Sequence, residues 1–578
     1  MQVAQSFSGR TWSLVASDEE AARALAREHS ISGVLARLLV LRGVKNEDAA
    51  DYLNPSLKRL LPEPRTLVHM DKAVARVMAA LAKGEAIAVF GDYDVDGSCS
   101  SALLYDYLSA VGSAPRLYTP DRMTEGYGPN APALLKLKEE GIGLVITVDC
   151  GAGAVEPLAA AREAGLDVVV LDHHATEHDL PVVAQVNPNA AGDVSGLGHV
   201  CATGITFLFL VALNRALREA GRNGGSEPEL IEAVDLVGLA TVCDVVPLTG
   251  VNRAFVRSGL AKLAKLERPG LAALARIAGV APPFTPYHLG FVFGPRINAG
   301  GRVGRCGLGV DLLTAKGDAA EEFALALDTH NRERQAIEKL ILDEAVALAA
   351  PQAEAPFLFV AGEGWHPGVV GIVAGRLKDR FNKPAFVAGF EGGLGRGSAR
   401  SVAGADIGAM VRAAREAGVI EGGGGHAMAA GFNLKPDQTE PFHRFLTEAF
   451  AGGVAAEAAA LSIEGLIAPS GATVAMVRDI ARAGPFGAGN PEPVLAVPDA
   501  RVAFADVVGQ GHVRLRLTGG DGARLDAIAF RVADTALGRS LLEARGQRIH
   551  AAGRLRADAW NGNERVQLHL DDAAPASA

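Results

Sequence analysis

Three aspartates stand at alternate positions directly after a short apolar run, in the stretch "AIAVFGDYDVDG". They are Asp92, Asp94 and Asp96, and Gly97 follows them. If the backbone stays extended, the three side chains project to one side, because side chains alternate along a strand. Like charges placed this closely repel one another, and a divalent cation bound by the carboxylate oxygens relieves that repulsion. The spacing therefore predicts a metal site, with Gly97 as the turn into a helix that begins near Ser98.

Three further apolar runs, each predicted to be a strand, end in residues that bind metals. They are "LVITVDCGAG", "DVVVLDHH" and "LVGLATVCDVVPL", and they end at Asp149, at Asp172 with His173 and His174, and at Asp244. Ligands of open α/β sheets bind at the carboxyl ends of strands. Carboxylates combined with imidazole suit Mg²⁺ or Mn²⁺, and histidine favours Mn²⁺. Two such ions, roughly 3.5–4 Å apart, can hold a phosphoryl group and activate a water molecule.

Simpler explanations exist for each residue taken alone. A single aspartate after a strand is usually a turn or helix cap, and a His-His pair is more often structural than metal-binding. A calcium-binding EF-hand loop needs a glutamate six residues after the glycine, where this chain has Leu103. Cys150 and Cys243 are most simply small buried residues. Four such run ends at one edge of a sheet favour the metal site over these explanations.

The elements that must position these residues alternate between apolar runs and helical stretches, which is typical of a parallel sheet covered on both faces. The fold class predicted is α/β, with two α/β lobes joined by one or two long helices, and a C-terminal β-barrel best described as an OB-fold. The predicted ranges are 1–70 (helical segment), 71–318 (catalytic domain), 319–352 (connecting helix), 353–455 (second α/β domain), 460–573 (OB-fold) and 574–578 (disordered tail).

The bulk composition narrows the class of protein. A formal net charge of −10 argues against coating nucleic acid by bulk charge, although a local basic groove remains compatible with it. Five scattered cysteines without a CxxC pair argue against a zinc ribbon and fit a reducing cytosol. The first twenty residues lack the pattern of a signal peptide, and no apolar run reaches membrane-spanning length. We therefore expect a cytoplasmic protein without membrane association.

The run ends also resemble a known family. "GDYDVDG", "VDCGAG", "LDHH" and "VCDVVPL" look like the four motifs of the DHH phosphoesterase superfamily. "GPRINAGGRVG", "LDTHNRERQAIE", "GEGWHPGVVGIVAGRL", "GRGSARSV", "EGGGGHAMAAGF" and "PFGAGNPEPVL" narrow the resemblance to the RecJ exonucleases, from about residue 35 to 570. Two departures are visible: residues 201–204 read "CATG" where the family usually has "CGAG", and "GPRINAGGR" replaces "GPRINAAGR".

The resemblance implies hydrolysis of single-stranded DNA from its 5′ end, with release of mononucleotides, by DHH, DHHA1 and OB domains in that order. It implies two Mn²⁺ or Mg²⁺ ions and a role in DNA repair, recombination and mismatch repair. Single-strand-binding protein and a helicase are the implied partners of a monomer associated with the nucleoid. Asp149 would bridge the metals, Asp172 would orient the imidazoles and His174 would face the scissile phosphate. The implied metal ligands are Asp92, Asp94, Asp96, Asp149, His173 and Asp244. The implied catalytic residues are Asp94, Asp96, Asp149, His173, His174 and Asp244.

Arginines among glycines are the candidates for holding DNA, because glycine permits close approach of backbone amides to phosphate. A lone arginine is more often a solvated surface charge. Arg296 and Arg302 are the candidates for a 5′-phosphate pocket. Trp560 can stack a base, with a role in the core or at its rim equally open. The full set of candidate DNA contacts is Arg296, Asn298, Arg302, Arg396, Ser398, Arg400, Ser401, Gly424, Gly425, His426 and Trp560.

Two other functions compete with the exonuclease. One is a DHH phosphoesterase acting on nanoRNA, a cyclic dinucleotide or pyrophosphate, but such enzymes end after the second domain, so the additional N-terminal segment and barrel favour a polymeric substrate. The other is a non-enzymatic replication scaffold resembling inactivated DHH proteins. Those proteins have lost ligand residues, whereas each candidate ligand is present in this sequence.

Overall fold

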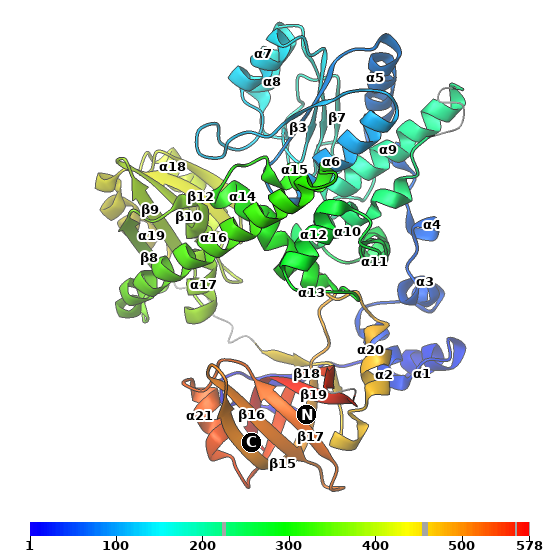
Figure 1. Ribbon diagram of the computed structural model, residues 1–578. Coiled ribbons are helices and arrows are strands. Elements are labelled where there is room, and N and C mark those ends of the chain that lie inside the picture. The colour runs from blue at the N-terminus through cyan, green and yellow to red at the C-terminus, as the bar shows by residue number, and fades with distance from the viewer. Residues whose placement is uncertain (222–226, 453–459, 561–562, 577–578) are drawn as a thin grey trace. The chain divides into compact units, whose positions relative to one another are not determined.

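The computed structural model describes residues 1–578 except 222–226, 453–459, 561–562 and 577–578. The side chains of 558–560 and 563 are also outside the description. The chain forms two compact units (Figure 1). The larger unit contains Pro64–Cys243 and Lys262–Ala456. The smaller unit contains Met1–Glu63, Asp244–Ala261 and Glu457–Ala578. Each unit is therefore assembled from segments that are far apart in the sequence.

The first lobe of the larger unit contains a five-stranded, fully parallel sheet in the order β4-β3-β5-β6-β7. Its central strands are continuous apolar runs because both faces of the sheet are covered by helices. Helices α7 and α8 pack on one face, and α5, α6 and α9 lie on the other (Figure 1). The bounds are β3 (Ile87–Gly91), β4 (Arg116–Tyr118), β5 (Leu144–Val148), β6 (Asp167–Leu171), β7 (Ala184–Val186), α5 (Met70–Lys83), α6 (Val95–Ala110), α7 (Ala131–Glu139), α8 (Val155–Glu163) and α9 (Ala202–Glu219).

Helices continue the larger unit after this sheet, and one of them corrects a prediction. The apolar run before Asp244, predicted to be a strand, is helix α10 (Val234–Cys243). Its first eight residues are buried, so the run carries no polar periodicity that would distinguish a buried helix from a buried strand. The other helices are α12 (Pro269–Ile277), α13 (Pro286–His288), the π-helix η5 (Leu289–Phe293), α14 (Gly294–Val303), α15 (Leu308–Thr314) and the single 31-residue helix α16 (Ala319–Ala349).

The second lobe of the larger unit contains a five-stranded sheet in the order β11-β12-β10-β9-β8. Only β8 and β9 run parallel; the other neighbours are antiparallel. Phenylalanines from the sheet and from α19 form the core on one face. The bounds are β8 (Leu358–Glu363), α17 (Pro367–Phe381), β9 (Ala385–Glu391), β10 (Leu394–Arg400), α18 (Ile407–Glu416), β11 (Gly422–His426), β12 (Ala429–Leu434) and α19 (Thr439–Ala449).

The smaller unit contains a closed five-stranded barrel in the order β15-β16-β17-β19-β18, in which β18 pairs back to β15. Chain order 1-2-3-5-4-1 with a helix between the third and fourth strands is the OB-fold, as predicted. The bounds are β15 (Leu495–Val508), β16 (His512–Thr518), β17 (Arg524–Ala529), α21 (Ala536–Glu543), β18 (Arg548–Trp560) and β19 (Asn563–Pro575). Strand β19 continues past residue 574, where the sequence predicts a disordered tail.

The N-terminal residues belong to this smaller unit and are not a separate helical segment. Besides helices α1 (Glu19–Glu28) and α2 (Gly33–Leu41), they form strands β1 (Gln2–Val3) and β2 (Trp12–Leu14), and β2 pairs with β13 (Leu461–Ile463). Such pairing between segments so far apart in the sequence leaves no local signal. The unit also contains α3 (Ala49–Leu53), α4 (Leu57–Leu60), α11 (Gly250–Leu263) up to Ala261, β14 (Gly465–Leu466) and α20 (Val474–Ala481). None of the described helices is long and apolar enough to cross a bilayer.

Candidate metal centre and nucleic-acid site

The ends of three neighbouring strands bring three aspartates together. Strands β3, β5 and β6 are paired in register, so that their last residues lie side by side, and Asp92, Asp149 and Asp172 are the next residue in each case. Asp149 has a left-handed backbone with φ 60°, which is strained for a residue with a side chain. All three side chains are buried. This is the edge at which the sequence predicts the metal site.

The other two aspartates of the first motif reach the site by a different route from the one predicted. Asp94 is the N-cap of helix α6, where its Oδ1 accepts a hydrogen bond from Gly97 N at 3.0 Å. Asp96 lies within the first turn of that helix, so the three aspartates do not share one side of an extended strand. Helix α6 begins at Val95 and not near Ser98. Gly97 is required because a Cβ atom there would lie 2.5 Å from the carbonyl oxygen of Asp92.

Carboxylates converge in this site. Oxygens of Asp92, Asp94 and Asp149 all lie within 4.8 Å of one another. Burial, followed by repulsion from Asp94, raises the pKa of Asp92 well above its ordinary range. Burial, followed by repulsion from Asp96, Asp94 and Asp92, raises the pKa of Asp149 well above its ordinary range. Burial, followed by repulsion from Asp96, also raises the pKa of Asp94. The arrangement is therefore unfavourable without a positive charge.

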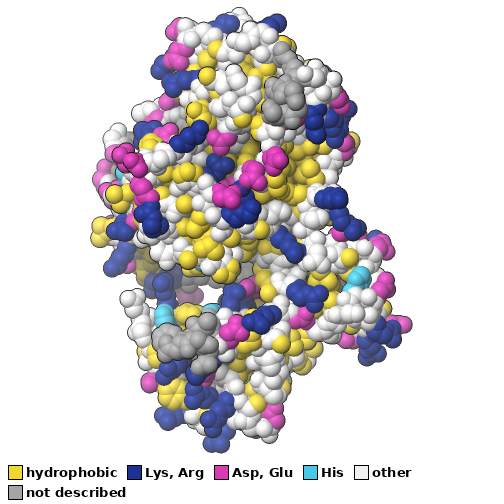
Figure 2. Space-filling model, turned by 45° about the vertical axis from the view of Figure 1, so that its right-hand side comes forward, with side chains coloured by type: hydrophobic (Ala, Val, Ile, Leu, Met, Phe, Trp, Pro, Cys, Tyr) yellow, Lys and Arg dark blue, Asp and Glu magenta, His cyan; other side chains and the backbone are white. Residues whose placement is uncertain are grey.

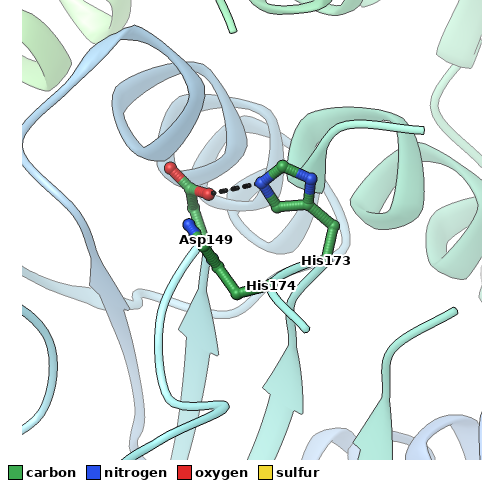
Figure 3. Close-up of side chains that lie close together, drawn as sticks. All are labelled: Asp149, His173 and His174. Carbon is green, nitrogen blue, oxygen red and sulfur yellow. Dashed lines mark ion pairs between the residues drawn. The ribbon is translucent and has the colours of Figure 1, made fainter. Parts of the chain in front are cut away.

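Two histidines stand next to these carboxylates. His173 Nε2 lies 3.4 Å from Asp149 Oδ1 and 3.9 Å from Asp96 Oδ2 (Figure 3 shows the contact with Asp149). Burial lowers the pKa of His173, which favours the neutral imidazole that can bind a metal. His174 Nδ1 lies 2.7 Å from Asp172 Oδ1. Donors from Asp149, His173 and His174 come within 4.8 Å of one another.

Asp172 has the opposite electrostatic environment from Asp149. Burial raises its pKa, but hydrogen bonds and charge from His174, with a hydrogen bond from Ala152 N, outweigh burial and hold that pKa below its ordinary value. The amides of His173 and His174 also donate to its Oδ1, at 2.7 and 3.2 Å. Asp172 therefore holds the imidazole of His174 and the backbone of both histidines in place.

The donor set fits a divalent cation such as Mn²⁺ or Mg²⁺. Carboxylate oxygens predominate and an imidazole nitrogen joins them, which is the combination these ions prefer. Asp92 Oδ1 is buried and has no hydrogen-bond partner among the described residues. Asp244 directly follows helix α10 in the chain and is the first residue of the smaller unit's middle segment, so its role as a ligand stays a prediction.

Arginines gather beside the carboxylates. Burial, followed by repulsion from Arg122, Arg334 and Arg400, lowers the pKa of Arg302 to about 10. Arg302 donates to the carbonyl oxygen of Gly368 at 3.1 Å, and Arg400 donates to Ser398 Oγ at 2.8 Å. Neither arginine forms an ion pair with a carboxylate within the described part of the chain. A buried arginine surrounded by other cations is the pattern of an anion-binding site.

The backbone amides of the "GPRINAGGR" stretch, predicted to approach phosphate, are used inside a helix, because residues Gly294–Val303 form α14. Its glycines permit close packing: a Cβ on Gly301 would lie 3.1 Å from atoms of Tyr93. Arg296 pairs with Asp328 at 2.9 Å and donates to the carbonyl of Val292, so it already has a carboxylate partner, which it shares with Arg332. Asn298 Oδ1 is buried and has no hydrogen-bond partner among the residues described.

The remaining DNA-binding candidates lie on the second lobe or in the barrel. Arg396 on β10 donates to the carbonyl oxygen of Met123 at 3.1 Å, which joins the two lobes of the larger unit. Ser401 is buried and donates to Ala405 O. Gly424, Gly425 and His426 belong to β11, the edge strand of its sheet, so alternate amides face away from β12. Trp560 ends β18, and its side chain lies outside the described residues.

Comparisons with known proteins identify the family. The DHH family N-terminal domain matches residues 86–241, the DHHA1 domain 354–452 and the RecJ OB domain 463–572. The single-stranded-DNA-specific exonuclease RecJ of Escherichia coli K12 is 33% identical over 567 residues, covering 94% of this chain and 96% of that protein. The same exonuclease of Bacillus subtilis 168 is 32% identical, covering 97% of this chain and 70% of that protein. The chain belongs to the RecJ family.

Solved structures of RecJ proteins agree in fold and in cofactor. RecJ of Thermus thermophilus in complex with Mn²⁺ has a TM-score of 0.82 and 27% identity, covering 97% of this chain and 79% of that chain. An exonuclease RecJ bound to manganese has a TM-score of 0.58 and 31% identity, covering 67% of this chain and 95% of that chain. The predicted fold class is confirmed. The metals in these RecJ structures are the ones that the donor set here favours.

The structure adds residues that sequence reasoning missed. Tyr127 donates its hydroxyl proton to Asp149 O at 3.0 Å and lies 3.3 Å from His174 Nδ1. Arg122 lies over the ring of Tyr93, and its charge slightly offsets the burial and repulsion that raise the pKa of Asp92. Both residues come from the stretch "RMTEGYG" between β4 and α7. Its only local signal is a pair of glycines, because the loop becomes part of the site through contacts that are distant in sequence.

Proposed function

We propose that this protein is a metal-dependent exonuclease that digests single-stranded DNA from the 5′ end and releases 5′-mononucleotides during DNA repair, recombination and mismatch repair. The observation that carries the proposal is the convergence of the Asp92, Asp94 and Asp149 carboxylates beside His173 at the ends of parallel strands. The names of the RecJ relatives support the substrate.

We assign the metal ligands to Asp92, Asp94, Asp96, Asp149, His173 and Asp244. Bound Mn²⁺ or Mg²⁺ supplies Lewis-acid chemistry: it neutralises phosphate charge and makes a bound water nucleophilic. The chain's own residues orient the reaction. Asp172 fixes the His174 imidazole, which faces the scissile phosphate in this proposal, and the Tyr127 hydroxyl restrains both His174 and the Asp149 backbone.

The 5′ preference is proposed to come from the arginines around Arg302. Arg296 is the weaker of the two predicted candidates because it is already paired with Asp328, whereas Arg302 and its neighbours Arg122 and Arg400 lack a carboxylate partner within the described residues. Arg302→Gln should reduce kcat/KM about 10-fold or more on 5′-phosphorylated ends and little on 5′-hydroxyl ends, since one charge-assisted bond contributes roughly 1.5–3 kcal/mol. Equal losses on both ends would contradict the assignment, and Arg296→Gln is the matched comparison.

Local arginines, rather than a basic face, are proposed to hold the strand. On the face in view, Figure 2 shows Lys and Arg side chains interspersed with Asp and Glu side chains. We propose that a strand passes between the two lobes of the larger unit, where Arg396 contacts the Met123 backbone, and that a duplex is too wide to do so. Blunt duplex DNA degraded as fast as single strands, without a helicase, would contradict this.

The deciding experiment digests single-stranded DNA labelled at either end, in Mn²⁺, Mg²⁺ or EDTA. Digestion from the 5′ end should release labelled mononucleotide at once from the 5′-labelled strand, and circular single strands should resist because they have no end. Asp149→Ala should abolish activity in both metals. Cleavage of a dinucleotide in preference to a long strand would instead favour the small-substrate phosphoesterase.

The remaining features are part of the same proposal. We propose a cytoplasmic, nucleoid-associated monomer that cooperates with single-strand-binding protein and a helicase. The barrel is proposed to add affinity for the strand, as OB-folds do.

A further inference from the structure

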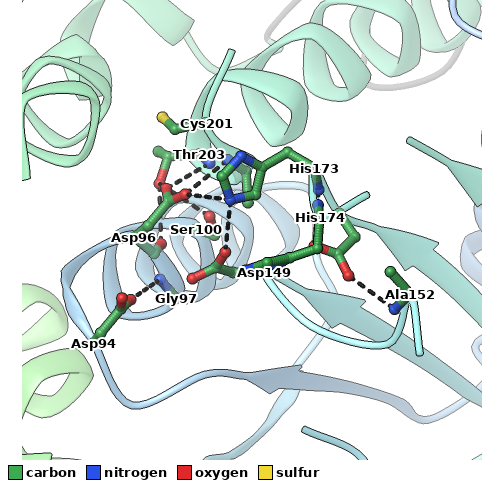
Figure 4. Close-up of polar contacts among 12 residues, drawn as sticks. Asp94, Asp96, Gly97, Ser100, Asp149, Ala152, His173, His174, Cys201 and Thr203 are labelled. Carbon is green, nitrogen blue, oxygen red and sulfur yellow. Dashed lines mark hydrogen bonds and ion pairs between the residues drawn. The ribbon is translucent and has the colours of Figure 1, made fainter. Parts of the chain in front are cut away.

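The first residues of helix α9 hold the carboxylate of Asp96. Asp96 Oδ2 accepts a hydrogen bond from Ala202 N at 2.7 Å. Asp96 Oδ1 accepts one from Thr203 N at 2.8 Å, and Figure 4 shows Thr203 next to Asp96. Amides in the first turn of a helix lack partners within the helix, and the dipole of this 18-residue helix favours a negative charge there. The carboxylate is therefore oriented by the protein itself.

The hydroxyl of Thr203 adds a third contact to Asp96. Thr203 Oγ1 lies 2.6 Å from Asp96 Oδ1 and 3.0 Å from the carbonyl oxygen of Asp96. Both of these oxygens only accept, so Thr203 donates its proton to Asp96. Ser100 Oγ lies 2.9 Å from Thr203 Oγ1, and because the Thr203 proton is already used, Ser100 is the donor there. All three side chains are buried, and hydrogen bonds in such a chain strengthen one another.

The hydrogen bonds divide the two oxygens of Asp96 into different roles. A carboxylate oxygen offers two lone pairs, and Oδ1 uses both for Thr203 N and Thr203 Oγ1. Oδ2 uses one for Ala202 N and keeps the other. It is Oδ2 that faces the metal centre, 3.9 Å from His173 Nε2. Without the Thr203 hydroxyl, both oxygens would have a lone pair to offer.

We propose that Thr203 is a positioning residue of the metal centre: its hydroxyl, supported by Ser100, occupies Asp96 Oδ1, so that Asp96 presents one lone pair of Oδ2 to a divalent cation. The inference rests on the proposed function, because it takes Asp96 as a metal ligand. The "CGAG" pattern noted above has alanine at position 203, which would keep the backbone N–H and lose the hydroxyl. Removing the hydroxyl should therefore weaken the site without abolishing it.

Another threonine of the same helix provides a matched control. Thr206, like Thr203, is fully buried, but its Oγ1 has no hydrogen-bond partner among the described residues. Thr206→Ala removes the same atoms from the same helix without touching Asp96. A general packing effect of a Thr→Ala change in α9 should therefore be equal in the two variants.

The experiment titrates the metal-free full-length protein with Mn²⁺, following free Mn²⁺ by electron paramagnetic resonance and binding heat by calorimetry. Thr203→Ala should weaken the binding of one Mn²⁺ equivalent by about 10-fold or more, the usual effect of removing an outer contact of a metal ligand. The Mn²⁺ affinity of Thr203→Ser should stay within about two-fold of wild type because serine retains the hydroxyl. Ser100→Ala, which removes only the supporting hydroxyl, should weaken the same equivalent by a smaller factor.

Two outcomes would overturn the role of Thr203: wild-type Mn²⁺ affinity in Thr203→Ala, or an equal loss in Thr206→Ala. If Thr203→Ala does not fold, Ser100→Ala with wild-type affinity overturns it instead. A wild-type protein that binds no Mn²⁺ would refute the proposed metal centre itself. A failure of the role given to Thr203 would be seen only in the variants, whereas a failure of the proposed metal centre would be seen in the wild-type protein. In cleavage assays, Thr203→Ala should need more Mn²⁺ for half-maximal rate and should recover at saturating Mn²⁺.

Discussion

Two buried aspartates at neighbouring strand ends should respond to neutralisation with opposite signs. Asp149 and Asp172 are 3% and 0% exposed, and both follow central strands of the parallel sheet. Burial and neighbouring carboxylates raise the pKa of Asp149, whereas hydrogen bonds and the charge of His174 outweigh burial and lower the pKa of Asp172. In metal-free protein, Asp149→Asn should therefore stabilise the larger unit, and Asp172→Asn should destabilise it.

The size of the effect follows from the geometry. Oxygens of Asp149, Asp92 and Asp94 lie within 4.8 Å of one another, and two unit charges at that distance repel by about 3 kcal/mol at an effective dielectric constant of about 20. Unfolding entropy is about 2.1 cal/mol/K per residue, or about 0.8 kcal/mol/K for the roughly 375 residues of the larger unit. Removing one repulsion of this size should raise Tm by about 4 °C. Asp172→Asn loses charge-assisted bonds that contribute about 1.5–3 kcal/mol each, so Tm should fall by a similar amount.

The pH dependence should differ in sign as well. The unfolded chain releases the Asp149 proton near its ordinary pKa of 3.8, but the metal-free folded protein retains that proton to higher pH. The folded state then binds more protons, so its stability falls as pH rises above about 4. The lowered pKa of Asp172 has the opposite effect on stability. Asp172 stabilises the folded state above its ordinary pKa of 3.8, and this stabilisation is lost as pH falls below that value. Asp149→Asn should flatten the fall in stability above about pH 4.

Thermal unfolding by circular dichroism, in EDTA and in excess Mn²⁺, measures both effects. In EDTA the order of Tm should be Asp149→Asn, wild type, Asp172→Asn, from highest to lowest. In Mn²⁺ the Tm of the wild type should exceed that of Asp149→Asn, because the cation stabilises the folded state by binding it and the variant has lost a proposed ligand. An Asp149→Asn protein that melts below wild type in EDTA would refute the view that repulsion dominates this cluster.

Two further changes test other parts of the structure. Gly97→Ala places a Cβ 2.5 Å from the Asp92 carbonyl oxygen, so it should displace Asp92 and weaken Mn²⁺ binding at least about 10-fold by calorimetry, whereas Gly375→Ala, with open space around its Cβ, should leave binding unchanged. In the smaller unit, the buried Arg253 donates to Tyr52 O, Ala483 O and Gly484 O, and Arg253→Met should cost about 3 kcal/mol in urea unfolding by leaving these carbonyls without that donor. An unchanged urea midpoint for that unit would contradict the role given to Arg253.

Local patterns predicted the sheet because its strands are continuous apolar runs that alternate with helices. The burial of every residue in β3 and β5 is the physical reason for that pattern. The same reasoning failed at α10, where a uniformly buried helix gives the same run of apolar letters as a buried strand. The place of β1 and β2 in the smaller unit was not predictable either. Strand β2 pairs with residues 461–463, and the sequence of the N-terminal segment contains no pattern that indicates this partner.

The candidate site was predictable in its residue types more than in its geometry. Strand ends in register bring Asp92, Asp149 and Asp172 to one edge of the sheet. The alternation of apolar runs with helical stretches in the sequence was enough to predict that position. Glycine-rich stretches were misleading, because "GPRINAGGR" is a helix whose glycines permit close packing and not exposed amides. Tyr127 and Arg122 reach the site from a loop, and their roles depend on contacts with residues from other elements.

Asp96 shows why correct residue types and incorrect geometry can coexist. The alternate spacing of three aspartates suggested one face of a strand, yet Asp96 lies in the first turn of α6 and its carboxylate caps a different helix, α9. That placement lowers the cost of burying a further carboxylate near Asp92, Asp94, Asp149 and Asp172, since helix amides and the Thr203 hydroxyl stabilise its charge. The cluster therefore contains two carboxylates whose own charge is stabilised by hydrogen bonds, Asp96 and Asp172. The other three, Asp92, Asp94 and Asp149, are left in repulsion with their neighbours, and Asp96 is among those neighbours. In the proposed metal centre, a cation would gain the most binding energy from Asp92, Asp94 and Asp149, and the held carboxylates Asp96 and Asp172 would fix the geometry in which it binds.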